Sequence, residues 1–156
     1  MNKTKVNDFK YLYLLQSEFE DVNDTINSIK NYKLSEPDVA DASTIQKALD
    51  TTVVVSYTRN FTTSRGFRAA KRIQTLLKGV FDEGEVILHD KIMNLRNEEF
   101  VHSDRKKHKV QLIHDEMFTH SKMRARQPLE KKELELLSQM VSKIREKVTE
   151  LLKIVE

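Results

Sequence analysis

Residues 134–155 read LELLSQMVSKIREKVTELLKIV, and apolar side chains alternate three and four residues apart along the whole stretch. This spacing is typical of a helix that buries one stripe, here sustained over about three heptads, and Pro128 suits its first turn. Such a seam needs a partner helix. The partner is either the N-terminal helix, which gives an antiparallel bundle, or another subunit, and the pattern fits both. The stripe consists of Leu134, Leu137, Val141, Ile144, Val148, Leu151 and Val155.

The N-terminal third carries a second helical stripe with the same alternation. It ends around Leu34, because Ser35-Glu36-Pro37-Asp38 follows and proline disfavours α conformation in the residue before it. The sequence therefore predicts a long first helix that can pack on the last one. Its apolar positions are Leu12, Leu15, Phe19, Val22, Ile26 and Ile29.

A second helix is expected from Pro37 or Asp38 onward. The β-branched run 51–57 also fits a strand. Helical spacing before the run and the lack of a strand to pair with it favour a helix. The apolar positions on which this interpretation depends are Ile45, Ala48, Leu49, Val53 and Tyr57.

Two shorter helices are expected in the middle of the chain. Residues 62–80 have helical apolar spacing after a turn at Ser64-Arg65-Gly66. The next helix should span about 83–101, because Asp82 followed three residues later by Glu85 matches a capping box.

Composition favours an all-α protein: the 156 residues include three Gly, two Pro and 33% charged residues, few of the turn formers that a sheet needs. We expect a single domain over 1–156, an up-and-down bundle of about four to five helices, with 102–127 as a loop or mobile connection, briefly extended at 109–113. Cysteine is absent, which excludes thiolate chemistry and disulfides. No apolar run approaches a membrane span and the first residues lack a signal-peptide core, so we expect a soluble, cytoplasmic protein.

The stretch LRNEEFVHSDRKKH, residues 95–108, combines groups that can act on a phosphate. Arg96 is always charged and can fork onto phosphate oxygens, whereas His102 titrates near neutrality. Positions six apart lie roughly 120° from each other on a straight helix. The two side chains therefore converge only if the helix bends or ends between them, or if two copies meet across a dimer axis. Asn97 can orient either group.

The phrase LRNEEFVHSD resembles the motif of the HEPN superfamily: an arginine, a polar residue, a spacer and a histidine at a helix end, here Arg96, Asn97 and His102. The helix order is also similar, with the aromatic-arginine segment Tyr57-Thr58-Arg59-Asn60-Phe61 ending the second helix. The resemblance covers most of the chain. It implies a compact helical domain that dimerises and brings two motifs together.

By this resemblance, the function is that of a metal-independent endoribonuclease, a hydrolase of toxin–antitoxin or antiviral defence systems. It implies RNA as substrate, a homodimer, a possible antitoxin protein, and no cofactor. Members paired with a nucleotidyltransferase antitoxin often carry Tyr two residues after the histidine, whereas this chain has Asp104. Two alternatives stay open: a non-catalytic module that binds RNA, a nucleotide or a protein, and a purely structural helical partner.

Basic residues supply a candidate RNA track. Residues 51–81 contain six cations and no Asp or Glu, and a second cluster follows the histidine. A solvated helix face is the plain alternative. Histidines recur every six residues from His102 to His120, a spacing that places no pair on one helical face, so we expect no metal site. The proposed substrate-binding residues are Arg59, Arg65, Arg68, Lys71, Arg72, Arg105 and Lys106.

Overall fold

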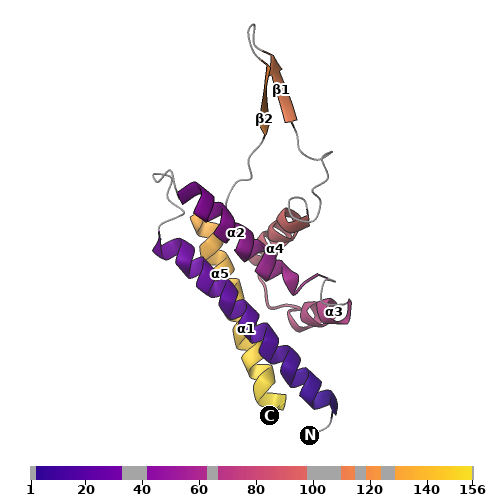
Figure 1. The fold of residues 1–156 in the computed structure, drawn as a ribbon. Coiled ribbons are helices and arrows are strands. Elements are labelled where there is room, and N and C mark those ends of the chain that lie inside the picture. The colour runs from indigo at the N-terminus through magenta and orange to yellow at the C-terminus, as the bar shows by residue number, and fades with distance from the viewer. Residues whose placement is uncertain are drawn as a thin grey trace.

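The computed structural model describes residues 3–32, 42–62, 67–97, 110–114, 119–123 and 129–155. The described chain is an all-α bundle, as predicted, with one added β-hairpin (Figure 1). Its elements are α1 (Lys3–Asn31), α2 (Ala42–Arg59), α3 (Phe67–Leu76), α4 (Glu83–Leu95), β1 (Val110–His114), β2 (Thr119–Met123) and α5 (Lys131–Val155).

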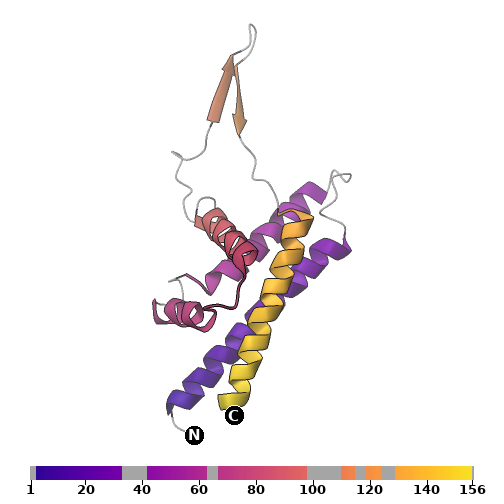
Figure 2. The same cartoon turned by 180° about the vertical axis from the view of Figure 1, so that it is seen from behind.

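The two long helices, α1 and α5, lie antiparallel along most of their length, and both chain ends lie at the same end of the pair (Figure 1 and Figure 2). All six predicted apolar positions of α1 are buried, as are the first five of α5. The partner of the C-terminal seam is therefore the N-terminal helix of the same chain. Ser138 of α5 also donates a hydrogen bond to the side-chain oxygen of Asn23 in α1, at 3.0 Å.

The far end of the seam departs from the predicted heptad. Leu151 is only half-buried, and Leu152 takes the inner position. A straight helix has 3.6 residues per turn, whereas a heptad repeat assumes 3.5. The residue that faces the partner helix therefore falls progressively later than the heptad predicts, and after about three heptads the next residue, here Leu152, faces inward.

Helix α2 confirms the helical interpretation of the β-branched run, since Val53, Val54 and Tyr57 are buried on one face. Its threonine hydroxyls donate to carbonyls four residues back, for example Thr51 to Lys47 at 2.7 Å. The expected start near Pro37 or Asp38 lies outside the described residues.

Two apolar positions of the predicted helix, Ile45 and Ala48, lie within α2 as expected but away from its buried face. Ile45 is 55% exposed and Ala48 is exposed. Ala48 precedes Tyr57 by nine residues, which is half a turn away, and Ile45 precedes it by twelve, a third of a turn away. The buried stripe instead follows Val53, Tyr57 and Phe61.

The third helix is shorter than predicted. It begins at Phe67 and ends at Leu76, although Leu77 beyond it is still buried. Gly79 has φ of +77°, a left-handed conformation that glycine adopts without steric cost, and the amide of Val80 bonds back to the Leu77 carbonyl at 3.0 Å. This turn redirects the chain towards α4.

Within 102–127, predicted as a loop, β1 and β2 pair as an antiparallel hairpin with Val110 opposite Met123 and His114 opposite Thr119. The extended stretch expected at 109–113 is therefore a strand, but its pairing partner was not predicted. In both views the hairpin projects away from the helices (Figure 1 and Figure 2). Among the described helices, none is long and apolar enough to cross a membrane.

Replacing Ile144 by Ala should lower the free energy of unfolding by about 2–5 kcal/mol, because it leaves a cavity in the α1–α5 seam. The matched control on the same helix is Ile154→Ala, at a side chain that is 75% exposed, with an expected change within about 0.5 kcal/mol. Denaturant unfolding measures both. Equal losses in the two variants would contradict the assigned seam.

Candidate functional site

Helix α4 carries the candidate motif, and its start is fixed by the predicted capping box. The backbone amide of Glu85 donates to Asp82 Oδ1 at 2.9 Å, and the backbone amide of Asp82 donates to Glu85 Oε2 at 2.9 Å. Two amides that the helix leaves unpaired are satisfied in this way. The first turn of α4 therefore begins at a defined residue.

The same Glu85 joins α4 to α5. Its side chain is 1% exposed and accepts a hydrogen bond from Lys143 Nζ at 2.7 Å, while Asp82 lies 3.8 Å from the same ammonium. The bond to Glu85 raises the pKa of Lys143 above its ordinary value, so the ammonium form is favoured. A buried carboxylate requires such a partner.

His89, one turn further along α4, contacts α2. Its Nδ1 lies 2.9 Å from the hydroxyl of Tyr57, and the ring of Phe61 packs edge-on at 4.7 Å between centroids. Burial lowers the pKa of His89 below 6.5, an effect that the charge of Asp90 partly opposes. Burial and the charge of Glu85 raise the pKa of Tyr57 far above its usual value. The phenol thus stays protonated and shares this hydrogen bond with a neutral imidazole.

His89 is not among the functional residues predicted from the sequence. Its partner Tyr57 is 32 residues away, so no local pattern reveals the pair. The sequence does contain one indication of its position: His89 precedes Arg96 by seven residues, which places both on one face of a helix.

A third contact holds the second half of α4. Lys91 pairs with Glu133 in the first turn of α5, and Glu133 also accepts from the backbone amide of Glu130 at 3.0 Å. Helix α4 is thus attached to α5 at Glu85 and Lys91, and to α2 at His89.

The first two motif residues lie just beyond this anchored segment. Regular α-helix ends at Leu95, and Arg96 and Asn97 continue in a wider π-helical turn. The backbone amide of Arg96 bonds to the carbonyls of Ile92 and Met93. Its guanidinium Nη1 donates to Asn97 Oδ1 at 3.1 Å. The structure therefore brings Arg96 and Asn97 together and presents them at the surface, with Arg96 half-buried.

The predicted helix end near Val101 and the third motif residue, His102, lie outside the described residues. Regular helix ends at Leu95, before Arg96, and the segment between Arg96 and His102 in which a bend or an end is needed for convergence is described only as far as Asn97. Whether the two side chains converge stays a prediction.

The proposed RNA-binding residues divide into three groups. Arg59 at the end of α2 and Lys71 on α3 are exposed. Arg72 instead fastens α3 to α1, because its guanidinium pairs with Asp8 at 2.8 Å and stacks on the ring of Tyr11 at 4.6 Å. For the rest the structure describes no side chain; these residues are Arg65, Arg68, Arg105 and Lys106.

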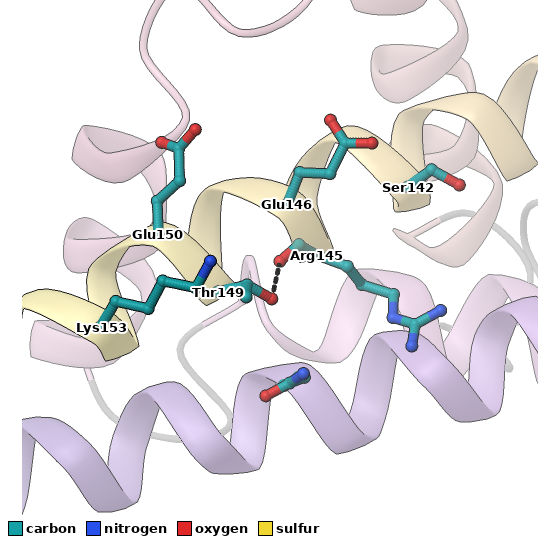
Figure 3. Close-up of a pocket in the computed structure, with 7 residues that line it drawn as sticks. Ser142, Arg145, Glu146, Thr149, Glu150 and Lys153 are labelled. Carbon is teal, nitrogen blue, oxygen red and sulfur yellow. Dashed lines mark hydrogen bonds between the residues drawn. The ribbon is translucent and has the colours of Figure 1, made fainter. Parts of the chain in front are cut away.

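An open groove of about 480 Å³ lies elsewhere, between α5 and α1 (Figure 3). It mixes the cations Arg145 and Lys153 with the carboxylates Glu146 and Glu150, and Arg145 is already paired with Glu20 at 3.1 Å. Alternating charge does not favour a polyanion. The groove is therefore a poorer RNA site than the end of α4. Its other lining residues are Gln16, Ser142 and Thr149.

Within the described residues, no group of three His, Asp or Glu side chains is arranged to hold a metal ion. No protein-family model, curated protein or solved structure matches this chain. Membership of the HEPN superfamily stays a prediction from the motif.

Acidification should destabilise the protein through His89. Its pKa in the folded state lies below the 6.5 of the unfolded chain, so the unfolded chain binds more protons between the two values. Stability is therefore highest above pH 6.5 and decreases as the pH falls through 6.5 towards the folded-state pKa. Unfolding midpoints measured against pH should fall less steeply in His89→Asn. Parallel curves for the two proteins would show that His89 does not contribute.

Lys143→Met should lower the unfolding midpoint clearly, because it leaves the buried Glu85 carboxylate without its cation. Adding Glu85→Gln in the same chain should recover part of the loss. Lys147→Met is the control: its Glu150 partner is exposed, so the midpoint should hardly move. Similar losses for the two single lysine variants would refute the special role of the Glu85 contact.

Proposed function

We propose that the protein is a metal-independent endoribonuclease of the HEPN type that acts as a homodimer, with Arg96, Asn97 and His102 at a composite cleft. The observation that carries the proposal is the side-chain bond between Arg96 and Asn97 at the end of the anchored helix α4. An arginine held in this way has lost part of its freedom before any phosphate arrives. Preorganised donors of this kind each contribute about 3–4 kcal/mol to catalysis.

The chemistry requires three tasks. A proton must leave the 2′-hydroxyl of the RNA, another must reach the departing 5′-oxygen, and the negative charge on phosphorus must be stabilised. His102 suits the first or the second of these proton transfers because imidazole titrates near neutrality, and a homodimer supplies a second His102. Arg96 suits the charge, and its Nη1 bond to Asn97 leaves other guanidinium donors for phosphate oxygens. The residues of the motif thus cover the reaction with no metal.

The outer face of α4 supports the homodimer. Val86 is 44% exposed and Ile87 is 65% exposed, although both are large apolar side chains. Val86 and Asn97 are eleven residues apart, about 16 Å along a helix. A second copy that covers the apolar pair brings the two motifs together if the two α4 helices run side by side in the same direction, and separates them if they run in opposite directions.

The second candidate function is an RNA- or nucleotide-binding module without catalysis. The exposed cations Arg59, on the helix α2 that packs on α4, and Lys71, on α3, favour it because they provide positive charge and need no reactive group. For both candidates we propose a cytoplasmic location. A toxin or antiviral role with an antitoxin partner is part of the catalytic proposal alone. Cleavage separates the two candidates.

Purified protein should cut a mixed RNA in the presence of excess chelator and leave 2′,3′-cyclic phosphate or 3′-phosphate ends. Arg96→Ala and His102→Ala should each lower the rate by at least about a hundredfold, the scale expected for losing a charge-stabilising donor or an acid–base group. Lys153→Ala, which removes a cation from the α1–α5 groove, should cut like the wild type.

Three results would count against catalysis at this site. The first is cleavage that requires a divalent metal, and the second is cleavage that survives both motif substitutions. The third is a folded wild-type protein that binds RNA as tightly as its two motif variants and cuts nothing, which would favour the binding module.

A further inference from the structure

The contact between Tyr57 and His89 is one of three that hold α4, the helix whose C-cap residue is Arg96. His89 and Arg96 are seven residues apart, so they lie within about 20° of each other around α4 and about 10 Å apart along it. A helix transmits rotation along its axis because its backbone bonds resist twisting. A change in how α4 rests on α2 at His89 therefore moves the guanidinium two turns further on.

Of the titratable groups near His89, the imidazole itself is the one that changes charge most readily near neutral pH. Tyr57 of α2 stays protonated. On α4 itself, Asp90 is adjacent and Glu85 lies one turn earlier, where Lys143 of α5 compensates its charge. Besides Tyr57, the rings that contact the imidazole among the described residues are those of Phe61 and Phe81, both uncharged, with centroids 4.7 and 6.0 Å from its own.

Protonation of His89 removes the acceptor at Nδ1 that one tautomer of the neutral ring provides. With its hydrogen on Nε2, the neutral imidazole accepts the phenol hydrogen at Nδ1, whereas an imidazolium donates from both nitrogens. The hydroxyl of Tyr57, on a side chain that is fully buried, would then receive a hydrogen bond, and its own hydrogen would lose the one acceptor that it has among the described residues. A buried donor in that state is unfavourable, so the interface between α2 and α4 must adjust.

We infer that His89 is a positioning residue for Arg96: its neutral ring, held by Tyr57, orients the Arg96–Asn97 end of α4, and its protonation displaces that end. The catalytic consequence rests on the proposed ribonuclease function, whereas the structural coupling does not. His89 acts through Tyr57 and the helix backbone, and it makes no contact with substrate in this account.

The coupling can be measured by nuclear magnetic resonance on the RNA-free protein. A His102→Ala background removes the histidine nearest to Arg96 in sequence. Between about pH 8 and about pH 5, the backbone amide resonances of Arg96 and Asn97 should move with the same midpoint as the His89 ring, below its ordinary value of 6.5. Adding His89→Asn should abolish these shifts. Shifts that persist without His89 would overturn the inference.

Tyr57→Phe separates positioning from the electric field of a distant charge. This variant keeps the ring and removes the hydroxyl, so the His89 charge still changes with pH while the hydrogen bond is lost. The shifts at Arg96 and Asn97 should decrease by more than half. Unchanged shifts would mean that the amides sense only the charge of His89, which would contradict a positioning role.

Cleavage kinetics then test the consequence for the proposed function. Tyr57→Phe in the otherwise native chain should lower kcat by roughly ten- to a hundredfold with little change in KM, as expected for a misplaced group. Coupling in the magnetic resonance titration without any cleavage by the wild type would refute the ribonuclease and support the positioning pair. Cleavage that Arg96→Ala abolishes, with no coupling to His89, would refute the pair and support the ribonuclease.

Discussion

The apolar seam between α1 and α5 is the constraint on which the rest of the structure depends. Two long stripes with the same three-four alternation bury each other along the molecule. Each fully buried Leu, Ile or Phe side chain contributes about 1.5–3 kcal/mol, so the seam outweighs any single polar contact described. The shorter helices are stable because this pair gives them a surface to pack on, as α2 does on α1 and α4 does on both α2 and α5.

Polar contacts then determine how α4 sits on that surface. Apolar packing alone allows a helix small rotations about its axis. The hydrogen bond of 2.7 Å between Lys143 and the buried Glu85 carboxylate restricts such rotation of α4. Glu85 with Lys143, His89 with Tyr57, and Lys91 with Glu133 act at three successive heights of α4. The motif begins where these contacts end, so Arg96 lies half-buried at the surface, at the end of an anchored helix.

Features of the fold that depend on residues close together in the sequence were predicted correctly. Helical periodicity predicted the buried faces of α1 and α5, and the spacing of Asp82 and Glu85 predicted a capping box that the structure contains. Features that depend on distant neighbours were missed. On α2, the face of Tyr57 is buried in the core and the apolar side chain of Ile45 is exposed. His89 contacts Tyr57, a residue 32 positions away in the sequence. The motif identified Arg96 and Asn97, which share a hydrogen bond, as candidate site residues, while their chemistry stays a proposal.

The most direct test of the central claim, that the Arg96–Asn97 end of α4 is the surface that meets RNA, is to map where RNA touches the protein. A photoreactive RNA would be cross-linked to the full chain and the modified peptides identified by mass spectrometry. The account predicts cross-links concentrated on the peptides that follow Met93 and on those around Arg59, and their loss in Arg96→Ala. Cross-links centred on the α1–α5 groove at Arg145 and Lys153, unchanged in Arg96→Ala, would contradict it.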